Sequence, residues 1–172
     1  MKRSSPVEAT ILFAGTLYQN PEVFLLAKEE LKGFFGEIAI ESPDLEWKNS
    51  EYYRDELGWP ITRTFLFFRD RIDPLRLPEI KQTTDEIEER LSTGGKRKIN
   101  IDPGYMTLSK VVLASTKNYS HRLYIGKGIF AELTLVNTKG RYRPHLFTYR
   151  DYASEACIEI FAKARELLKA RS

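Results

Sequence analysis

The sequence has little cysteine and little histidine, and this shortage argues against several classes of protein. Cys157 is the lone cysteine among 172 residues, so no internal disulfide can form, whereas a secreted chain of this size would often carry cysteine pairs. The neighbours Ala156, Ile158 and Phe161 predict that Cys157 is a small buried side chain rather than a reactive thiol. Two histidines and one cysteine, with no pair at ligand spacing, argue against a zinc site.

Long apolar runs are also missing. The basic start at residues 1–3 is followed by Ser4, Ser5 and Pro6, where a signal peptide would need an apolar segment. The longest apolar runs, such as residues 64–68, are far shorter than the ~20 residues that span a bilayer. These absences predict a soluble, cytoplasmic protein with no membrane partner.

The composition that is present is that of one globular domain over residues 1–172. Hydrophobic residues make up 42% and charged residues 30%, which allows a sizeable core. The net charge of +3 is small for a dedicated nucleic-acid binder. The basic residues gather between 117 and 150, where only Glu132 opposes Lys117, Arg122, Lys127, Lys139, Arg141, Arg143 and Arg150. That stretch is either a surface for an anionic partner or a solvated face that serves solubility.

Periodicity and turn residues predict the order of the elements. We expect strands at 10–18, 37–41, 62–69 and 97–101, and helices at 20–36 and 74–94, with Asn20 as N-cap of the first helix. Asp102-Pro103-Gly104 is expected to end the fourth strand, before a short helix at 107–114. Further strands are expected at 121–125, 129–136 and 141–147, and a last helix at 154–169. This order predicts an α+β fold, with a ferredoxin-like β-α-β-β-α-β half extended by a C-terminal antiparallel meander and a terminal helix.

Several strings of the sequence are similar to those of a known family. They are NIDPGY at 100–105, HRLYIGKGI at 121–129 with Ala131-Glu132 after it, and the earlier 41–43 and Tyr52-Tyr53. Together they resemble the bacterial family called Domain of Unknown Function 4416, over nearly the whole chain. Members of that family often end the meander in a Pro-Trp-Thr-Tyr-like string, and here the string LFTY at 146–149 lacks the tryptophan.

Some members of that family carry a GTP-binding label, which the residues of this chain do not support. No G-x-x-x-x-G-K-[ST] string occurs, and Gly126-Lys127-Gly128 is followed by Ile129. This glycine-rich string is also expected in a turn between strands, where no helix dipole helps to hold a phosphate. The string NTKG at 137–140 is not an N-K-x-D base reader. A P-loop nucleotide site is excluded, while nucleotide binding by another mode stays open.

Alternation within the meander gives a strand register. A three-residue loop at 126–128 pairs Leu123 with Ala131, and the same register pairs Arg122 with Glu132. Pairing Asn137 with Gly140 in the next hairpin sets Glu132 opposite His145. One polar sheet face is then expected around Glu132, made of Arg122, Tyr124, Glu132, Thr134, Arg143 and His145. His121 falls on the opposite, apolar face.

The candidate site residues follow from this face and from the turn at 102–104. Glu132 and His145 are candidates for general acid–base catalysis, and Asp102 is a third, as a carboxylate at a strand end. The ligand-binding candidates are Arg122, Tyr124, Lys127, Arg143, His121 and Tyr53. The alternatives are a solvent-facing cross-strand salt bridge at Glu132 and a simple turn at Asp102. The cofactor is unknown, although Mg²⁺ is possible if Glu41 and Asp44 join Asp102.

The long connection at 42–61 is rich in aromatic residues. Tyr52, Tyr53 and Trp59, with Arg54 and Arg63 nearby, could clamp a base or a sugar, or could pack as a lid over the core. Our first hypothesis is therefore a protein that binds or acts on an anionic small molecule, a nucleotide or a phosphorylated metabolite. The alternatives are an RNA-binding module and an assembly or regulatory protein without chemistry. The oligomeric state and any reaction stay undetermined.

Overall fold

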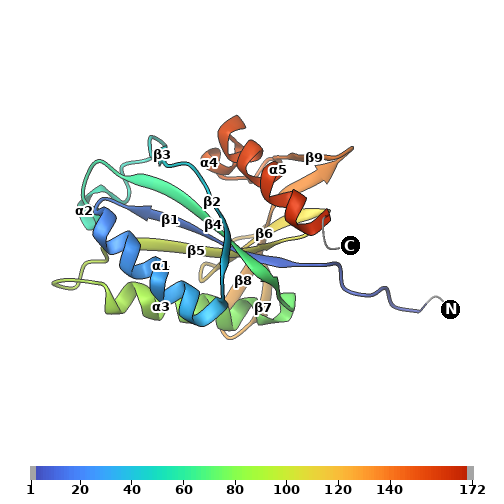
Figure 1. The fold of residues 1–172 in the computed structure, drawn as a ribbon, viewed down its shortest axis with the longest axis horizontal. Coiled ribbons are helices and arrows are strands. Elements are labelled where there is room, and N and C mark those ends of the chain that lie inside the picture. Colours follow the sequence, from blue (N-terminus) through green and yellow to red (C-terminus); the bar gives the residue numbers. More distant parts are fainter. Residues whose placement is uncertain (1–2, 170–172) are drawn as a thin grey trace.

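A computed structural model describes residues 3–169 and contains one large antiparallel sheet with helices on both faces (Figure 1). In that part of the chain the strands are β1 (Ile11–Tyr18), β2 (Ile38–Glu41), β3 (Leu45–Glu46), β4 (Thr62–Arg71), β5 (Ile99–Met106), β6 (Lys110–Ser115), β7 (Leu123–Gly126), β8 (Ile129–Thr138) and β9 (Arg141–Arg143). The helices are α1 (Pro21–Phe35), α2 (Arg54–Leu57), α3 (Leu77–Arg90), α4 (Arg150–Ala153) and α5 (Glu155–Lys169), with a 3-10 turn η1 (Pro74–Arg76) before α3.

The strand order is β2-β4-β1-β5-β6-β8-β7, with β3 also on β4 and β9 also on β8. The mixed α and β composition of the fold is confirmed, and the strands of the meander continue the same sheet. The strand order as a whole differs from that of a ferredoxin-like unit, because β6, β8, β7 and β9 extend the sheet beyond β5. The expected ferredoxin-like topology is therefore not confirmed.

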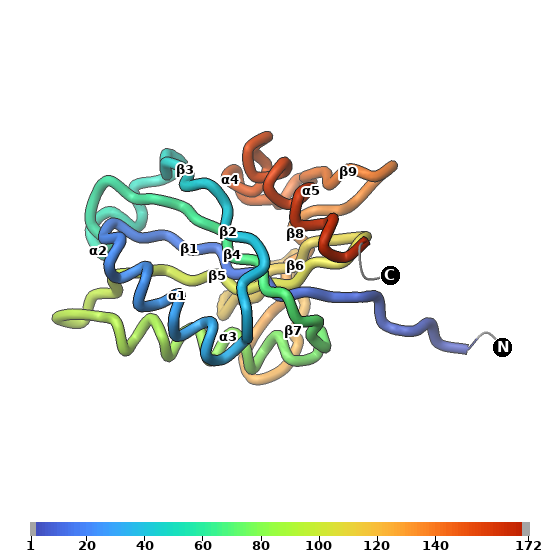
Figure 2. Tube along the Cα trace, in the orientation of Figure 1, coloured from blue at the N-terminus to red at the C-terminus, as the bar shows by residue number. Residues whose placement is uncertain are grey.

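Two apolar layers hold the helices against the sheet, and β1 contributes to both because its side chains alternate between the faces. Leu12 and Ala14 pack in the cluster that includes Ile80 of α3, while Phe13 packs in the cluster of Phe161 on α5. Figures 1 and 2 show α1 and α3 below the sheet and α4 and α5 above it. All of β1 is buried, and it lies between β4 and β5 in the sheet.

Local signals place α1 as the sequence predicts. The Asn20 side chain accepts a hydrogen bond from the backbone N–H of Glu22 at 2.9 Å, which caps the first turn. Gly36 ends the helix with a φ of 90°, in the left-handed region that favours glycine. The end of α1 and the start of β2 are thus set by residues close in sequence.

The expected break at 102–104 and the helix expected at 107–114 are both wrong. β5 continues through Asp102, Pro103 and Gly104, because β1 pairs along this whole segment. Gly104 permits the close approach, since a Cβ there would meet the Phe13 ring at 2.5 Å. Residues 110–115 form β6, which pairs with β5 and β8. Pairing of the whole segment with β1 overrides the local turn preference.

The second hairpin of the meander differs from the expected register by two residues. Thr138 pairs with Arg141, around a turn in which Lys139 and Gly140 have φ values of 55° and 83°. β9 ends at Arg143, and Pro144, which has no backbone N–H to donate, follows it. In the first hairpin the expected pairing of Leu123 with Ala131 is confirmed. The expected three-residue loop at 126–128 is wrong, because a register shift after Tyr124 pairs Gly126 with Ile129.

Two expectations from composition can be compared with the structure. Cys157 is buried at 1% exposure in the α5 core, as predicted. No helix within residues 3–169 is long and apolar enough to cross a lipid bilayer. The cytoplasmic location stays a prediction.

Candidate functional site

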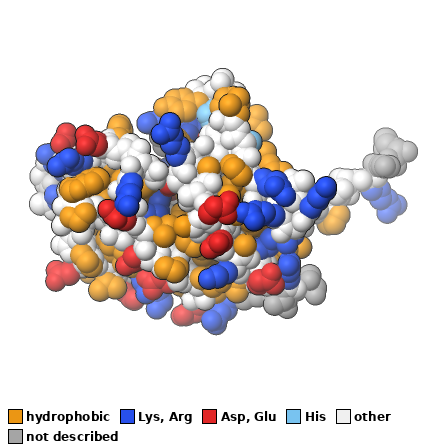
Figure 3. Space-filling view, turned by 90° about the horizontal axis from the view of Figure 1, so that it is seen from above, with side chains coloured by type: hydrophobic (Ala, Val, Ile, Leu, Met, Phe, Trp, Pro, Cys, Tyr) orange, Lys and Arg blue, Asp and Glu red, His pale blue; other side chains and the backbone are white. Residues whose placement is uncertain are grey.

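A pocket of about 530 Å³ opens on the sheet face that carries α4 and α5. Side chains from four strands reach it: Arg63 of β4, Asp102 of β5, Leu113 of β6 and Glu132 of β8. Ala114 and Ser115 of β6 also line it. The other walls come from three connections and α4, with Trp47, Asn49, Ser50, Tyr52, Tyr53, Lys117, Tyr119, Arg122, Tyr149, Arg150, Asp151 and Tyr152. Seen from above, this side of the molecule mixes basic, acidic and apolar side chains rather than presenting one charge (Figure 3).

Arg63 is the buried centre of one half of the pocket, at 4% exposure. Its guanidinium donates to Asp151 at 2.6 Å and to Asp102 at 3.3 Å. The ring centroids of Trp47 and Tyr152 lie 5.2 and 5.5 Å from its Cζ. Burial by itself lowers the pKa of Arg63, but attraction to Asp151 and to other neighbours outweighs it and raises that pKa. Arg63 therefore stays charged and cross-links β4, β5 and α4.

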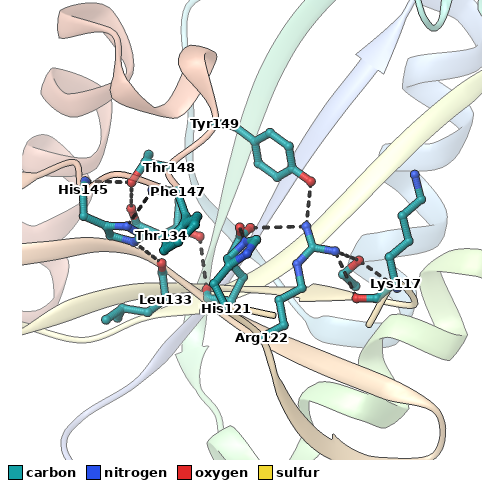
Figure 4. A network of polar contacts seen from close by, with 11 residues as sticks. Lys117, His121, Arg122, Leu133, Thr134, His145, Phe147, Thr148 and Tyr149 are labelled. Atoms are coloured by element: carbon teal, nitrogen blue, oxygen red, sulfur yellow. Dashed lines mark hydrogen bonds and ion pairs between the residues drawn. The ribbon is translucent and has the colours of Figure 1, made fainter. Parts of the chain in front are cut away.

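Arg122 and Glu132 form the other half, and both are buried. They lie on the same side of the sheet, as the register predicts, with Arg122 Nη2 3.7 Å from Glu132 Oε2. Arg122 also donates to the Tyr149 hydroxyl at 2.6 Å and to Ser115 Oγ at 2.9 Å (Figure 4). This half of the pocket is a polar network between β8, the 115–119 connection and the segment before α4.

His121 lies on the same face of the sheet as Glu132, so the prediction that it lies on the opposite, apolar face is wrong. Its Nε2 is 2.5 Å from Glu132 Oε1, and its ring stacks on Phe147 at a centroid distance of 4.6 Å. The reason is that β7 starts only at Leu123, so strand alternation does not govern the direction of His121. Glu132 thus contacts the pocket on one side and an imidazole on the other.

His145 is not opposite Glu132, and it does not line the pocket. Its Nε2 contacts the Leu133 carbonyl, and its backbone N–H donates to Thr148 Oγ1, which in turn donates to the Thr134 carbonyl (Figure 4). These contacts use the Leu133 and Thr134 carbonyls of β8, which lie between the residues that pair with β7 (129–131) and those that pair with β9 (136–138). His145 therefore stabilises the edge of β8 rather than contacting the pocket.

Three other candidates lie outside the lining. Tyr124 is 65% exposed on the edge strand, with its ring 5.3 Å from that of Phe130. Lys127 is at the tip of the first hairpin, and Arg143 is exposed opposite Val136. The polar face expected around Glu132 is thus divided, because only Arg122 and Glu132 of its members line the pocket.

The aromatic connection is divided in the same way. Tyr53 lines the pocket with Tyr52, and its ring meets that of Trp47 edge-on at 6.0 Å. Burial raises the pKa of the Tyr53 hydroxyl, so it is a hydrogen-bond donor at neutral pH. Trp59 lies outside the lining, beside Arg54 at 5.3 Å.

Sequence reasoning gave no pocket role to Trp47, Tyr149, Asp151 or Tyr152. Lys117 and Arg150 also line the pocket, and both had carried a signal as members of the basic stretch, as Trp47 had as an aromatic residue of the connection at 42–61. The others reach the pocket through contacts between segments far apart in sequence, which a pattern along the chain does not contain.

The three carboxylates proposed for Mg²⁺ do not meet. Asp44 accepts a hydrogen bond from Thr64 Oγ1 at 2.7 Å, and Glu41 pairs with Lys28 at 3.1 Å. Asp102 lies on the other sheet face. Its partner Arg63 and the Asp44 partner Thr64 are consecutive residues of β4, and consecutive residues of a strand point to opposite faces. Across residues 3–169 no group of three or more histidine, cysteine or acidic side chains is placed to hold a metal ion.

Three polar atoms in the wall of the pocket have no hydrogen-bond partner, although they are buried. They are Arg63 Nε, Arg122 Nε and the Tyr152 hydroxyl. Native proteins satisfy most buried polar atoms, and the exceptions mark places where water or a ligand completes the network. The pocket is thus built from groups that still have bonding capacity.

The fold and site define a single-sheet mixed α/β protein with a polar, aromatic-walled pocket. The chain belongs to the family described as Domain of unknown function (DUF4416), whose model matches residues 8–168. No curated protein matches the chain, and no solved structure matches it. Every lining residue falls within the matched range. Because the family carries no assigned activity, the function has to be argued from the pocket.

Proposed function

We propose that the pocket binds a small anionic molecule, a nucleotide or another phosphorylated metabolite. The observation that carries this proposal is the pocket itself, whose lining holds four basic side chains, two of them exposed at its edge. Its volume of about 530 Å³ lies within the range of small-molecule sites.

The charges of the lining favour an anion. Four basic side chains face three acidic ones in the wall, and two of the basic ones, Lys117 and Arg150, are exposed at the edge. Neither makes an ion pair with any residue in the described range 3–169, although Lys117 Nζ is 5.5 Å from the Tyr52 ring centroid. These two cations are free to contact a phosphate, while the aromatic walls offer faces to a base or a sugar.

Two carboxylates are placed to act on the ligand. Asp102 and Glu132 both line the pocket, and Glu132 is backed by His121 at 2.5 Å. A carboxylate within reach of a ligand hydroxyl can accept a hydrogen bond or take a proton. These contacts support Asp102 and Glu132 as the candidates for any chemistry at this site.

Thermal unfolding with a ligand panel tests the proposal. The panel holds nucleoside mono- and triphosphates, ribose 5-phosphate and inorganic phosphate, each with and without Mg²⁺. A ligand at about 100 times its Kd adds about 2.7 kcal/mol, a rise in Tm of about 5–10 °C for this size of domain. Lys117→Ala and Arg150→Ala should reduce the rise, while Lys127→Gln and Arg143→Gln, which change basic residues outside the lining, should not. No rise with any anion would overturn the proposal.

Short RNA belongs in the same panel, because the RNA-binding alternative has its own support. Tyr124 is exposed beside Phe130 on the edge strand, and Lys127 follows close by. RNA binding that weakens steeply with salt and is lost in Tyr124→Ala would move the function to this edge. Binding of nothing in the panel would favour an assembly or regulatory role.

Two finer expectations from the sequence also stay proposals. A ferredoxin-like unit in the first half is supported by the adjacency of β2, β4, β1 and β5, and by the packing of α1 and α3 in one apolar cluster. A cytoplasmic location is supported by the lone cysteine.

A further inference from the structure

The charged side chains of the pocket fall into two zones. The deep zone holds the buried Arg63 and Arg122 together with Asp102, Asp151 and Glu132, so three carboxylates outnumber two guanidinium groups. The outer zone holds Lys117 and Arg150, which are exposed. The net positive charge of the lining therefore comes from the outer zone.

A phosphate does not fit the deep zone. Arg63 already donates to Asp151 at 2.6 Å and to Asp102 at 3.3 Å, and Arg122 lies 3.7 Å from Glu132. A phosphate dianion placed there would compete with these carboxylates and would be repelled by them in a poorly solvated space. The outer zone has cations without carboxylate partners, so the anionic end of a ligand belongs there.

The deep zone instead offers hydrogen-bond acceptors that lack donors. The Asp102 side chain is 30% exposed, and its Oδ1 accepts no hydrogen bond within residues 3–169. Glu132 Oε2 accepts none either within that range, since its nearest cation is 3.7 Å away. The Tyr152 hydroxyl is buried with no partner. Carboxylate oxygens accept, and the unpartnered Nε–H groups of Arg63 and Arg122 in the same zone donate. Hydroxyl groups, which both donate and accept, therefore suit this zone.

We propose that the ligand is a sugar phosphate that enters sugar first. Its hydroxyl groups donate to Asp102 and Glu132 in the deep zone, and its phosphate stays with Lys117 and Arg150 in the outer zone. The faces of aromatic side chains in the walls, such as Tyr53, cover the apolar side of the sugar ring. This inference rests on the proposed function and narrows its ligand class to a sugar phosphate, free or as part of a nucleotide.

Calorimetric titration with matched probes tests the two zones. Ribose 5-phosphate should bind at least about tenfold more tightly than inorganic phosphate, because charge-assisted hydrogen bonds to the hydroxyls add to the phosphate contact. Asp102→Asn should weaken ribose 5-phosphate about tenfold and inorganic phosphate less than about twofold. Lys117→Ala should weaken both probes. Asp44→Asn, a carboxylate change on the opposite sheet face, should weaken neither.

A ligand-side deletion keeps the test independent of whether Asp102→Asn folds. Deoxyribose 5-phosphate, titrated into the unchanged protein, should bind more weakly than ribose 5-phosphate because one donor is missing. Equal affinities for ribose 5-phosphate, deoxyribose 5-phosphate and inorganic phosphate, all reduced by Lys117→Ala, would overturn the inference while leaving the proposed function standing. Binding of none of the three probes nor of the nucleotides would overturn both.

The source of the sugar phosphate is decided by a further comparison. If adenosine or guanosine monophosphate binds more tightly than ribose 5-phosphate, the sugar belongs to a nucleotide. If the nucleotides bind no better, the ligand is a free sugar phosphate. In both cases the sugar hydroxyls contact the same deep zone.

Discussion

Arg63 of β4 and Asp151 of α4 lie 2.6 Å apart, although 88 residues separate them in the sequence. The same guanidinium contacts Asp102 of β5 at 3.3 Å. One buried cation therefore joins the floor of the pocket to its wall, and the shape of the pocket depends on this ion-paired cluster.

Removal of this cation should unfold the protein more easily. Arg63→Met leaves Asp102 and Asp151 without their shared partner, and we expect a loss of about 3–5 kcal/mol in the free energy of unfolding. The double variant Arg63→Met/Asp151→Asn should recover part of that loss. Urea denaturation measures both. Arg54→Met, which changes an exposed arginine 3.5 Å from Glu51, should cost less than about 1 kcal/mol and serves as control. Equal losses for Arg63→Met and Arg54→Met would contradict the structural role of Arg63.

Gly15 makes room for the same cluster. A Cβ at Gly15 would lie 2.9 Å from the Tyr152 hydroxyl and 3.0 Å from Arg63 Nη1. We expect Gly15→Ala to destabilise the protein by about 1–3 kcal/mol through crowding. Gly33→Ala is the matched control, because nothing lies within 4 Å of its Cβ and the site is inside α1. That control should stabilise by about 0.5–1 kcal/mol, so the two substitutions are predicted to have opposite signs in thermal unfolding.

Glu88 should make stability depend on pH. Its carboxylate is buried and accepts from the Ile101 N–H at 2.7 Å, and burial raises its pKa from 4.5 to about 7 against the attraction of Lys81. As pH rises from 4.5 to 7, Glu88 loses its proton in the unfolded chain before it does so in the folded protein. Its contribution to the free energy of unfolding is therefore full below pH 4.5 and is lost as the pH approaches 7. The expected loss is about 3 kcal/mol. Glu88→Gln should flatten this part of the profile of unfolding free energy against pH, and Glu86→Gln, exposed on the same helix, should not.

His145 should affect stability rather than binding. Its imidazole contacts the Leu133 carbonyl and accepts from the Phe147 N–H at 3.1 Å, outside the pocket. His145→Ala should lower the free energy of unfolding by about 1 kcal/mol. The rise in Tm that ribose 5-phosphate produces should be unchanged, in contrast to Lys117→Ala. If the His145→Ala protein is stable but ribose 5-phosphate no longer raises its Tm, His145 contributes to ligand binding after all.

Cys157 should be unreactive in the folded protein. It is 1% exposed, and burial raises the pKa of its thiol. We expect an aromatic disulfide reagent to modify it at least about 100-fold more slowly in buffer than in 8 M urea (about the concentration that unfolds most domains). Fast modification of the native protein would show that α5 opens readily from the sheet.

The elements predicted correctly are those whose signals are local. Asn20 and Gly36 mark the ends of α1, and the buried runs of β1 and β4 are long and apolar. The turn signal at residues 102–104 failed because β1 and β6 flank β5, and sheet pairing outweighs local preference. The shift of two residues in the second hairpin has another cause. A shift of two keeps every side chain on its face, so alternation cannot detect it.

The candidate site divides along the same line. Arg122 and Glu132 lie together as alternation predicted, although Arg122 precedes β7 and no strand pair joins the two residues. The contact of Arg63 with Asp151 joins β4 to α4, and nothing in the pattern of either segment refers to the other. His121 was misplaced because it lies just before β7, where alternation no longer applies. The wall of a pocket made from loops is the part that a single sequence predicts least.

The order in which the pocket acquires its parts has a consequence during synthesis. β1, β4 and β5 can pair once residue 106 has left the ribosome, but α5 ends 63 residues later. At translation speeds of about 5–20 residues per second, this interval lasts roughly 3–13 s. During it, the phenylalanines of the α5 side, such as Phe13 and Phe65, lack the cover of the complete α5, and Arg63 lacks Asp151 until α4 has been made. The nascent chain therefore presents an aromatic sheet surface to chaperones, and translation that stops before α4 yields a product that exposes this surface permanently.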